Sequence, residues 1–459
     1  MNHSEHTDIF INHRLLRYFA PARSCIYGIL FYFFVLLLSP VSLQCEFDVS
    51  SFTYICLSIA SFCCGSLVVI PRRSQETFSL KTKHVQQAYK IILFLALIGT
   101  IAKFIDIFII RNLSFSQNMF ENREISLHYS GNVVALAAAF LMYAPYILLI
   151  FSFAVPASVT SGEKFLIWGL FGCQLIFPLM MGSRAGLLFP GLFLMIVLVY
   201  FKKIKLHLNT GIILVGVFLF ACGCILSGSM YRDRILLMNP QAIVEEATRG
   251  EGAANTVPAN DTVYHILSEL DDTSLLKAGI LGYVNICQYY LHGMLEFHGQ
   301  KQYVDQLGAH SWGNYMFSVY YRFFQQMTGW NPSPVLLTSY FVRPGIFCSM
   351  FGYSYTDFGW FGLLFMFLFG GIQKKLWCIV YYSGNLILLS WIFLGSIIIF
   401  LFPLLNLFPG TMTYAFTLMI ILYLILPMSV SPAKTQIEPS NSSRTLPLIL
   451  RVHDGPESE

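Results

Sequence analysis

The residue with the sharpest chemical interpretation is Arg184, which lies in Gly182-Ser183-Arg184-Ala185 between two apolar runs. The connection is so short that it must form a tight turn at the mouth of the helices it joins. A guanidinium is planar, always charged and rich in N–H donors, which suits a phosphate or pyrophosphate. The competing interpretation is an interfacial arginine that reaches lipid headgroups. We favour an anion-binding role for Arg184.

Four further arginines lie between the apolar runs of the second half. Arg232 and Arg234 flank an aspartate in Tyr231-Arg232-Asp233-Arg234, which is typical of either an anion site or a juxtamembrane charge cluster. Arg322 and Arg343 each have aromatic neighbours. Arginine for phosphate beside aromatic rings for sugar faces would suit a lipid-linked glycan, although each of these residues alone is also typical of a surface.

Two residues are candidates for proton transfer. Asp357, in Tyr355-Thr356-Asp357-Phe358-Gly359, opens an apolar run. It either caps the helix that follows, or acts as a general base or a clamp for a sugar hydroxyl. His310, in Gly308-Ala309-His310-Ser311-Trp312, is a weaker candidate for the same role.

Charges inside an apolar run are costly and indicate function by default. Lys103 and Asp106 are such charges, and their i, i+3 spacing places them on one helix face. We favour a structural ion pair over a functional one.

Most of the 11 cysteines lie in or beside apolar runs, where cysteine behaves as a small hydrophobic residue. A disulfide between Cys287 and Cys348 is a minor possibility. The sequence contains no CxxC, HExxH or carboxylate cluster with metal-ligand spacing, so we expect no metal and no cofactor.

The composition excludes a soluble protein. Of the 459 residues, 56% are hydrophobic and only 11% are charged, whereas a soluble domain carries roughly 25% charged residues. The formal net charge of +4 and the lack of a basic tract give no support to nucleic-acid binding. The fold class predicted is therefore an all-α polytopic membrane protein.

A membrane-spanning helix needs roughly 20 mostly apolar residues. About ten runs meet or approach this length, seven of them before residue 229 and three after residue 356. They lie near Cys25–Leu43, Phe52–Ile70, Ile91–Ile110, Val133–Val155, Phe165–Met181, Ala185–Phe201, Gly211–Gly228, Phe358–Ile372, Asn385–Phe402 and Met412–Met428.

The distribution of Lys and Arg predicts that both termini are cytoplasmic, because cytoplasmic loops are enriched in these residues. With that orientation, seventeen basic residues lie in inner segments and three in short outer loops. The inner ones are Arg14, Arg17, Arg23, Arg72, Arg73, Lys81, Lys83, Lys90, Lys164, Lys202, Lys203, Lys205, Lys374, Lys375, Lys434, Arg444 and Arg451, and the outer ones are Arg111, Arg123 and Arg184.

This orientation divides the chain into four parts. Residues 1–228 form an N-terminal bundle, residues 229–356 a large outer loop, residues 357–430 the C-terminal spans and residues 431–459 a disordered cytoplasmic tail. Within the outer loop, Ser274–Phe297 has helical spacing but too many polar groups for a comfortable span. We predict an interfacial or re-entrant helix there.

Three of these features together resemble the oligosaccharide repeat-unit polymerases, the Wzy-type O-antigen polymerases of bacterial inner membranes. They are Gly182-Ser183-Arg184-Ala185 at a short outer turn, the large outer loop, and the passage from Asn331-Pro332 through Thr338 to Tyr355-Thr356-Asp357-Phe358-Gly359-Trp360-Phe361-Gly362 and Gly370-Gly371. The resemblance covers most of the chain as architecture but only these motifs as residues.

The resemblance implies a multi-span glycosyltransferase. It would transfer the growing glycan from undecaprenyl pyrophosphate to the non-reducing end of a new lipid-linked repeat unit at the periplasmic face, in O-antigen lipopolysaccharide or similar polysaccharide biosynthesis. Arg184, with one or more of the four other arginines, would hold the phosphates in place of a metal, and Asp357 or His310 would act on the acceptor hydroxyl. The resemblance also implies a partner, a Wzz-type chain-length regulator.

Two alternatives stay open. A ligase that moves finished glycan onto lipid A–core differs only in its acceptor. A lipid-linked glycan flippase or transporter belongs to another class and should carry charges along its pathway inside the bundle, where this sequence has few.

Overall fold

The structure is a computed structural model of the whole chain. It describes residues 6–10, 12–42, 48–68, 77–117, 121–122, 125–126, 132–156, 159–180, 184–203, 218, 220–229, 231–232, 243–250, 256–329, 348–406, 412–426 and 431–432. In these ranges the chain is helical apart from short connections and three small strands.

The protein is an all-α polytopic membrane protein, as predicted. By length and composition, the described part of the chain holds six helical segments that can cross a membrane. They are α2 (Pro21–Leu38), α3 (Val49–Val68), α4 with the π-helix η2 (Thr82–Phe104 and Ile105–Ile110), α6 with α7 (Val133–Leu141 and Ala144–Ala154), α8 (Ser161–Met180), and α16, the short 3-10 helix η5 and α17 together (Met350–Phe358, Gly359–Phe361 and Gly362–Ser383).

Shorter apolar helices fill the remaining predicted positions. They are α9 (Arg184–Tyr200), the helical segment Phe220–Ser229, α18 (Leu386–Phe400) and α19 (Thr413–Ile425). Each predicted run therefore overlaps an apolar helical segment. The fourth run corresponds to both α6 and α7, the seventh is described only at Phe218 and Phe220–Gly228, and α16 lengthens the eighth to 34 residues.

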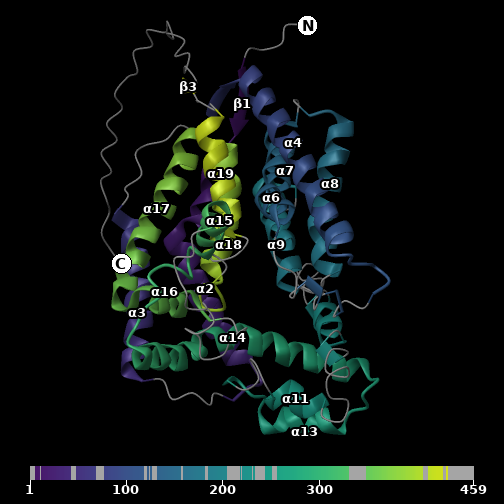
Figure 1. The fold of residues 1–459 in the computed structure, drawn as a ribbon, viewed down its shortest axis with the longest axis vertical. Coiled ribbons are helices and arrows are strands. Elements are labelled where there is room, and N and C mark those ends of the chain that lie inside the picture. The colour runs from purple at the N-terminus through teal and green to yellow at the C-terminus, as the bar shows by residue number, and fades with distance from the viewer. Residues whose placement is uncertain are drawn as a thin grey trace, which may run out of the picture.

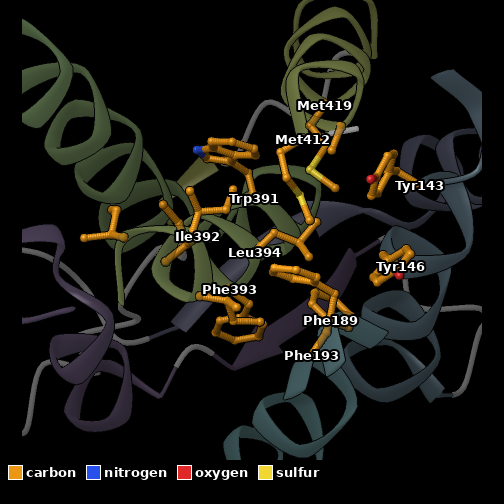
Figure 2. Packing of buried hydrophobic residues seen from close by; sticks show 14 of the residues in the cluster. Tyr143, Tyr146, Phe189, Phe193, Trp391, Ile392, Phe393, Leu394, Met412 and Met419 are labelled. Atoms are coloured by element: carbon orange, nitrogen blue, oxygen red, sulfur yellow. The ribbon is translucent and has the colours of Figure 1, made fainter. Parts of the chain in front are cut away.

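Helix α18 joins the two sides of the bundle. A helix that is apolar all round must be buried, and Leu386–Ile399 are all buried. In Figure 2, Phe193 of α9 lies between Phe393 of α18 on the left and Tyr146 of α7 on the right. The ring centroid of Phe193 lies 6.3 Å from that of Phe393 and 4.9 Å from that of Tyr146. On the other side, the Trp391 indole N–H donates to Oε1 of Gln373 in α17 at 2.9 Å.

Helices α3 and α17 are packed backbone to backbone. A Cβ atom added to Gly65 would lie 1.9 Å from the carbonyl oxygen of Phe367, and one added to Gly370 would lie 2.2 Å from that of Phe62. Small residues permit such close approach of helices in a membrane.

A small antiparallel sheet closes one end of the bundle (Figure 1). Strand β2 (Thr77–Lys81), which lies between α3 and α4, pairs with β1 (His6–Phe10) and with β3 (Ser431–Pro432). Next to it, α1 (His13–Leu16) and the 3-10 helix η1 (Arg17–Phe19) contact the end of α17, where the Trp377 indole donates to the Leu16 carbonyl at 3.0 Å. The sheet was not predicted. The sheet therefore brings β1, the segment before α4 and the segment after α19 to one end of the bundle.

The opposite end carries helices α11 (Ile243–Arg249), α13 (Asp261–Glu269) and α14 (Leu275–Leu307) of the predicted outer loop (Figure 1). Helix α15 (Ser318–Thr328), from the same loop, lies beside α19 in the bundle, where the hydroxyl oxygens of Tyr320 and Thr417 are 2.7 Å apart. Helix α14 crosses the direction of the bundle helices (Figure 1), which is the course expected of an interfacial helix. It is longer than predicted, because it continues past Phe297 until Gly308 ends it at φ 61°.

Helix α14 is also more buried than an interfacial helix should be. A Cβ atom added to Gly293 would lie 1.8 Å from the Leu404 carbonyl oxygen, and the Tyr32 hydroxyl of α2 donates to the Leu291 carbonyl at 3.0 Å. Several of its buried polar side chains are paired: the Gln300 amide donates to Thr356 at 2.9 Å and the Thr256 hydroxyl to Glu296 at 2.9 Å. These bonds explain how a helix with so many polar groups is accommodated inside the molecule.

Candidate functional site

Asp357 contacts the connection between α14 and α15. Its carboxylate accepts hydrogen bonds from the hydroxyl of Ser311, from the N–H of Tyr315 at 3.1 Å and from the N–H of Met316 at 2.7 Å. Its own carbonyl oxygen accepts from the N–H of Trp312 at 2.9 Å. The side chain is 0% exposed. Asp357 therefore holds the Ser311–Met316 turn in one conformation.

This geometry corrects both sequence interpretations of Asp357. It does not cap the following helix, because it is the next-to-last residue of α16, whose N-cap is Ser349. It is also poorly placed to act as a general base, because a fully buried carboxylate bonded to three donors has no access to an acceptor hydroxyl. The capping prediction was wrong because the apolar run begins after Asp357, whereas helix α16 begins before it, at Met350.

His310 lies directly beside this turn. Gly359 has φ 55°, and a Cβ atom there would lie 2.5 Å from Nε2 of His310, so the lack of a side chain makes room for the imidazole. The ring centroid lies 5.9 Å from that of Tyr355 and 6.5 Å from that of Trp312. Among the described residues, Nδ1 of His310 has no hydrogen-bond partner. His310 is thus positioned by packing, with a buried Nδ1 that is unpaired within the described part of the chain.

The turn that Asp357 holds also presents a strained aromatic residue. Trp312 has φ 49°, which a residue with a bulky side chain rarely adopts, and it is 66% exposed. Such strained backbone conformations persist only where the surrounding structure enforces them, and they are concentrated at ligand-binding and active sites. Trp360, at the start of η5, is a second exposed indole on this part of the chain, at 47%.

Next to His310 lies a group of polar and aromatic side chains that was not predicted from the sequence. The hydroxyl of Tyr355 donates to Oδ1 of Asp305 at 2.6 Å, and Lys301 forms an ion pair with Oδ2 of the same residue at 2.7 Å. The Tyr355 ring packs against Tyr54 of α3, with centroids 4.9 Å apart. The i, i+4 spacing of Lys301 and Asp305 was the available signal.

The structure brings His310 and Asp357 together, and of the five arginines it describes only the side chain of Arg232. Arg232 donates to the Asp272 carbonyl at 2.8 Å. Arg184 is the first residue of α9 and Arg322 lies in α15, but their side chains are outside the described part of the structure, and Arg234 and Arg343 are outside the described residues altogether. A joint phosphate site of the five arginines stays a prediction.

The predicted ion pair between Lys103 and Asp106 is confirmed, with Nζ and Oδ2 3.3 Å apart. The structure adds Arg111, whose Nε lies 3.0 Å from Oδ1 of Asp106. Arg111 was predicted to lie in a short outer loop, and its contact with Asp106 was not predicted.

The disulfide prediction is wrong, since Cys287 and Cys348 are both free and buried. Cys348 packs against the Gly293 carbonyl of α14 at 3.8 Å. Gly293 lies six residues beyond Cys287, or about 9 Å along a helix. Burial raises the pKa of the Cys287 thiol to about 11 and that of Cys348 further still, which keeps both thiols protonated. Among the described residues, no three His, Cys, Asp or Glu side chains are grouped as metal ligands.

Comparisons with protein-family models, curated proteins and solved structures found no match to this chain. What the fold defines on its own is the class, a polytopic membrane protein with a crosswise helix at one end of its bundle. The resemblance to Wzy-type polymerases remains a prediction.

Proposed function

We propose that this protein is a membrane glycosyltransferase that polymerises lipid-linked oligosaccharide repeat units. It would transfer the growing glycan from undecaprenyl pyrophosphate to the non-reducing end of a new repeat unit. The observation that carries the proposal is the Ser311–Met316 turn, which Asp357 holds rigid beside a half-buried His310 and an exposed Trp312. A base next to an exposed indole suits an enzyme that deprotonates a sugar hydroxyl.

In this mechanism His310 takes the proton from the acceptor hydroxyl as its oxygen attacks the anomeric carbon of the donor glycan. The bond from that carbon to the pyrophosphate oxygen breaks, and undecaprenyl pyrophosphate leaves with the electron pair. Asp357 acts as a positioning residue for the turn. Trp312 offers its ring to a sugar face.

The leaving group needs positive charge nearby, because negative charge develops on the pyrophosphate as the bond breaks. We assign that role to Arg184, with Arg232, Arg234, Arg322 and Arg343 as further candidates. Support comes from the position of Arg184 at the first residue of α9. Helix α9 ends at Tyr200, whose hydroxyl accepts from the N–H of Asn12 near β1. Arg184 thus begins its helix at the end remote from the sheet.

We further propose that the end with α14 is periplasmic, in a bacterial inner membrane, and that the sheet end is cytoplasmic. The support is the excess of Lys and Arg in the segments assigned to the cytoplasm. The donor would then be an undecaprenyl-linked glycan in the outer leaflet, and a Wzz-type chain-length regulator would be a partner.

Deletion of the gene, with surface polysaccharide resolved by size on a gel, tests the function. Single repeat units attached to lipid A–core are the expected result, because polymerisation alone is lost. Core without glycan, with long lipid-linked chains accumulating, would instead identify a ligase. An absence of lipid-linked glycan from the outer leaflet would identify a flippase.

The assignment of Arg184 is tested in the deletion strain by complementation. Arg184→Ala is expected to give only short chains at normal expression, while Lys90→Ala, an exposed change near the start of α4, restores full-length polymer. Full-length polymer from Arg184→Ala would remove Arg184 from the site.

A further inference from the structure

The cluster of Lys103, Asp106 and Arg111 has no part in the proposed chemistry so far. Asp106 is 0% exposed, and each of its oxygens contacts one cation, Oδ2 with Lys103 at 3.3 Å and Oδ1 with Arg111 at 3.0 Å. Nη1 of Arg111 donates a hydrogen bond to the hydroxyl of Ser126 at 2.7 Å. Two positive charges against one negative charge leave these three residues with a net charge of +1.

The backbone is shaped to bring Arg111 into this cluster. In an ordinary α-helix, residues five apart point to different sides, but η2 is a π-helix, in which i→i+5 bonds close each turn. The N–H of Arg111 donates to the Asp106 carbonyl at 3.0 Å, which completes such a turn. Asn112 follows with φ 53° and ends the helix. Such wide turns are found frequently at functional sites.

One cation of the cluster retains capacity to bind a ligand. The Lys103 side chain is 23% exposed. Its ammonium group has three N–H donors, and among the described residues it donates one hydrogen bond, to Asp106. Asp106 thus holds the ammonium in place without using its full binding capacity.

The cluster adjoins the connection that leads to Arg184. The Asn122 amide donates to the carbonyl of Met180, the last residue of α8, at 3.4 Å. Met180 also packs with Ile107 of η2 and with Leu113. The segment that carries the cluster is therefore attached to the end of α8, four residues before Arg184.

We propose that Lys103 and Arg111 form a phosphate-binding subsite for a lipid, with Asp106 as the residue that positions both cations. The ligand class is a lipid phosphate or pyrophosphate at this end of the bundle. The cations lie at the end of a membrane span, where the headgroup of a lipid would meet them. The choice of a polyprenyl pyrophosphate as the occupant rests on the proposed function, whereas the phosphate chemistry does not.

Binding is measured on the purified full-length protein in detergent by microscale thermophoresis. The probes are undecaprenyl pyrophosphate, phosphatidylglycerol and undecaprenol, which has no phosphate. Lys103→Gln is expected to bind undecaprenyl pyrophosphate about tenfold more weakly, the loss expected for one charge-assisted hydrogen bond. The control Lys90→Gln lies about 20 Å away along α4 and should bind as the unmodified protein does.

A second variant distinguishes a loss of lipid binding from a purely structural effect on stability. Asp106→Asn keeps a side-chain oxygen that can still accept from one of the two cations and removes the competing negative charge, so it should bind the phosphate lipids more tightly even where its melting temperature falls. A structural ion pair alone would lower the melting temperature in both variants and leave lipid affinity unchanged. That result, or equal affinity for undecaprenol, would overturn the proposal.

The probes also distinguish the two sources of phosphate. Preference for undecaprenyl pyrophosphate assigns the subsite to the donor lipid, and equal competition by phosphatidylglycerol assigns it to a membrane phospholipid. The assay requires no glycosyl transfer. A gene deletion that leaves polymerisation intact would thus refute the proposed function but not the phosphate-binding subsite. Unchanged lipid affinity of the variants would refute the subsite but not the proposed function.

Discussion

At the scale of single residues, the environment of a carboxylate decides its role more than its position in a motif does. Asp357 and Asp106 are both 0% exposed, yet one bonds to backbone N–H groups and the other to two cations. Sequence spacing predicted the pairing of Lys103 with Asp106. It could not predict Arg111, because the π-helical turn that aligns Arg111 departs from the periodicity on which the prediction relied.

His310 is expected to be needed for transfer and dispensable for folding. His310→Gln should lower the rate of polymer formation by roughly 10²-fold, the smaller end of what general-base catalysis supplies. The matched control is His265→Gln at an exposed position of α13. Activity of both variants is compared in membranes with equal protein content, and equal rates would show that His310 is not the base.

Asp357 is expected to act through the turn that it holds. Asp357→Ala leaves the N–H groups of Tyr315 and Met316 without their acceptor, at a cost of about 1.5–3 kcal/mol for each bond to a charged group. Asp357→Asn keeps one acceptor oxygen and should cost less. The melting temperature and protease cleavage near Trp312 report the effect. A stable, protease-resistant Asp357→Asn that abolishes transfer would instead indicate direct catalysis.

At the scale of elements, the spans were predictable because apolar length is a local property of the sequence. The helix pairs were not, because they depend on contacts between distant segments. The prediction of an interfacial or re-entrant helix at Ser274–Phe297 gave too short a helix, and it missed that polar side chains of α14 pair with residues such as Thr356 and Thr256 far along the chain.

The contact of α3 with α17 gives an element-scale prediction. Gly65→Ala places a Cβ atom 1.9 Å from the Phe367 carbonyl oxygen, so the helices must move apart. We expect destabilisation of about 1–3 kcal/mol, as for other overpacked sites, seen as a lower melting temperature in a fixed detergent. Gly172→Ala in α8 is the control, because a Cβ atom there meets nothing within 4 Å. Equal melting temperatures of the two variants would contradict the close packing.

At the scale of the whole molecule, the structure separates two ends. One has the sheet of β1, β2 and β3, and the other has α14 with the His310 turn (Figure 1). The basic residues predict an even number of spans with both termini in the cytoplasm, and this stays a prediction. The sheet itself could not be predicted, because it pairs short segments that are far apart in the sequence and none of them alternates strongly enough to indicate a strand.

The proposed orientation predicts the result of reporter fusions. A reporter that is active only in the cytoplasm should be active after the C-terminus and before the N-terminus. Fused to a chain cut after Leu307, the end of α14, it should be inactive. Activity at Leu307, or different activity at the two termini, would contradict the orientation.

The pairing of β3 with β2 has a consequence for biosynthesis. Ser431 and Pro432 follow the last membrane helix, so the second edge of β2 stays open until every span has left the ribosome. A nascent chain of this protein therefore inserts all its helices before its two ends are joined. A chain that stops short of residue 431 keeps its spans but leaves β2 with an exposed strand edge, the kind of surface on which chains aggregate.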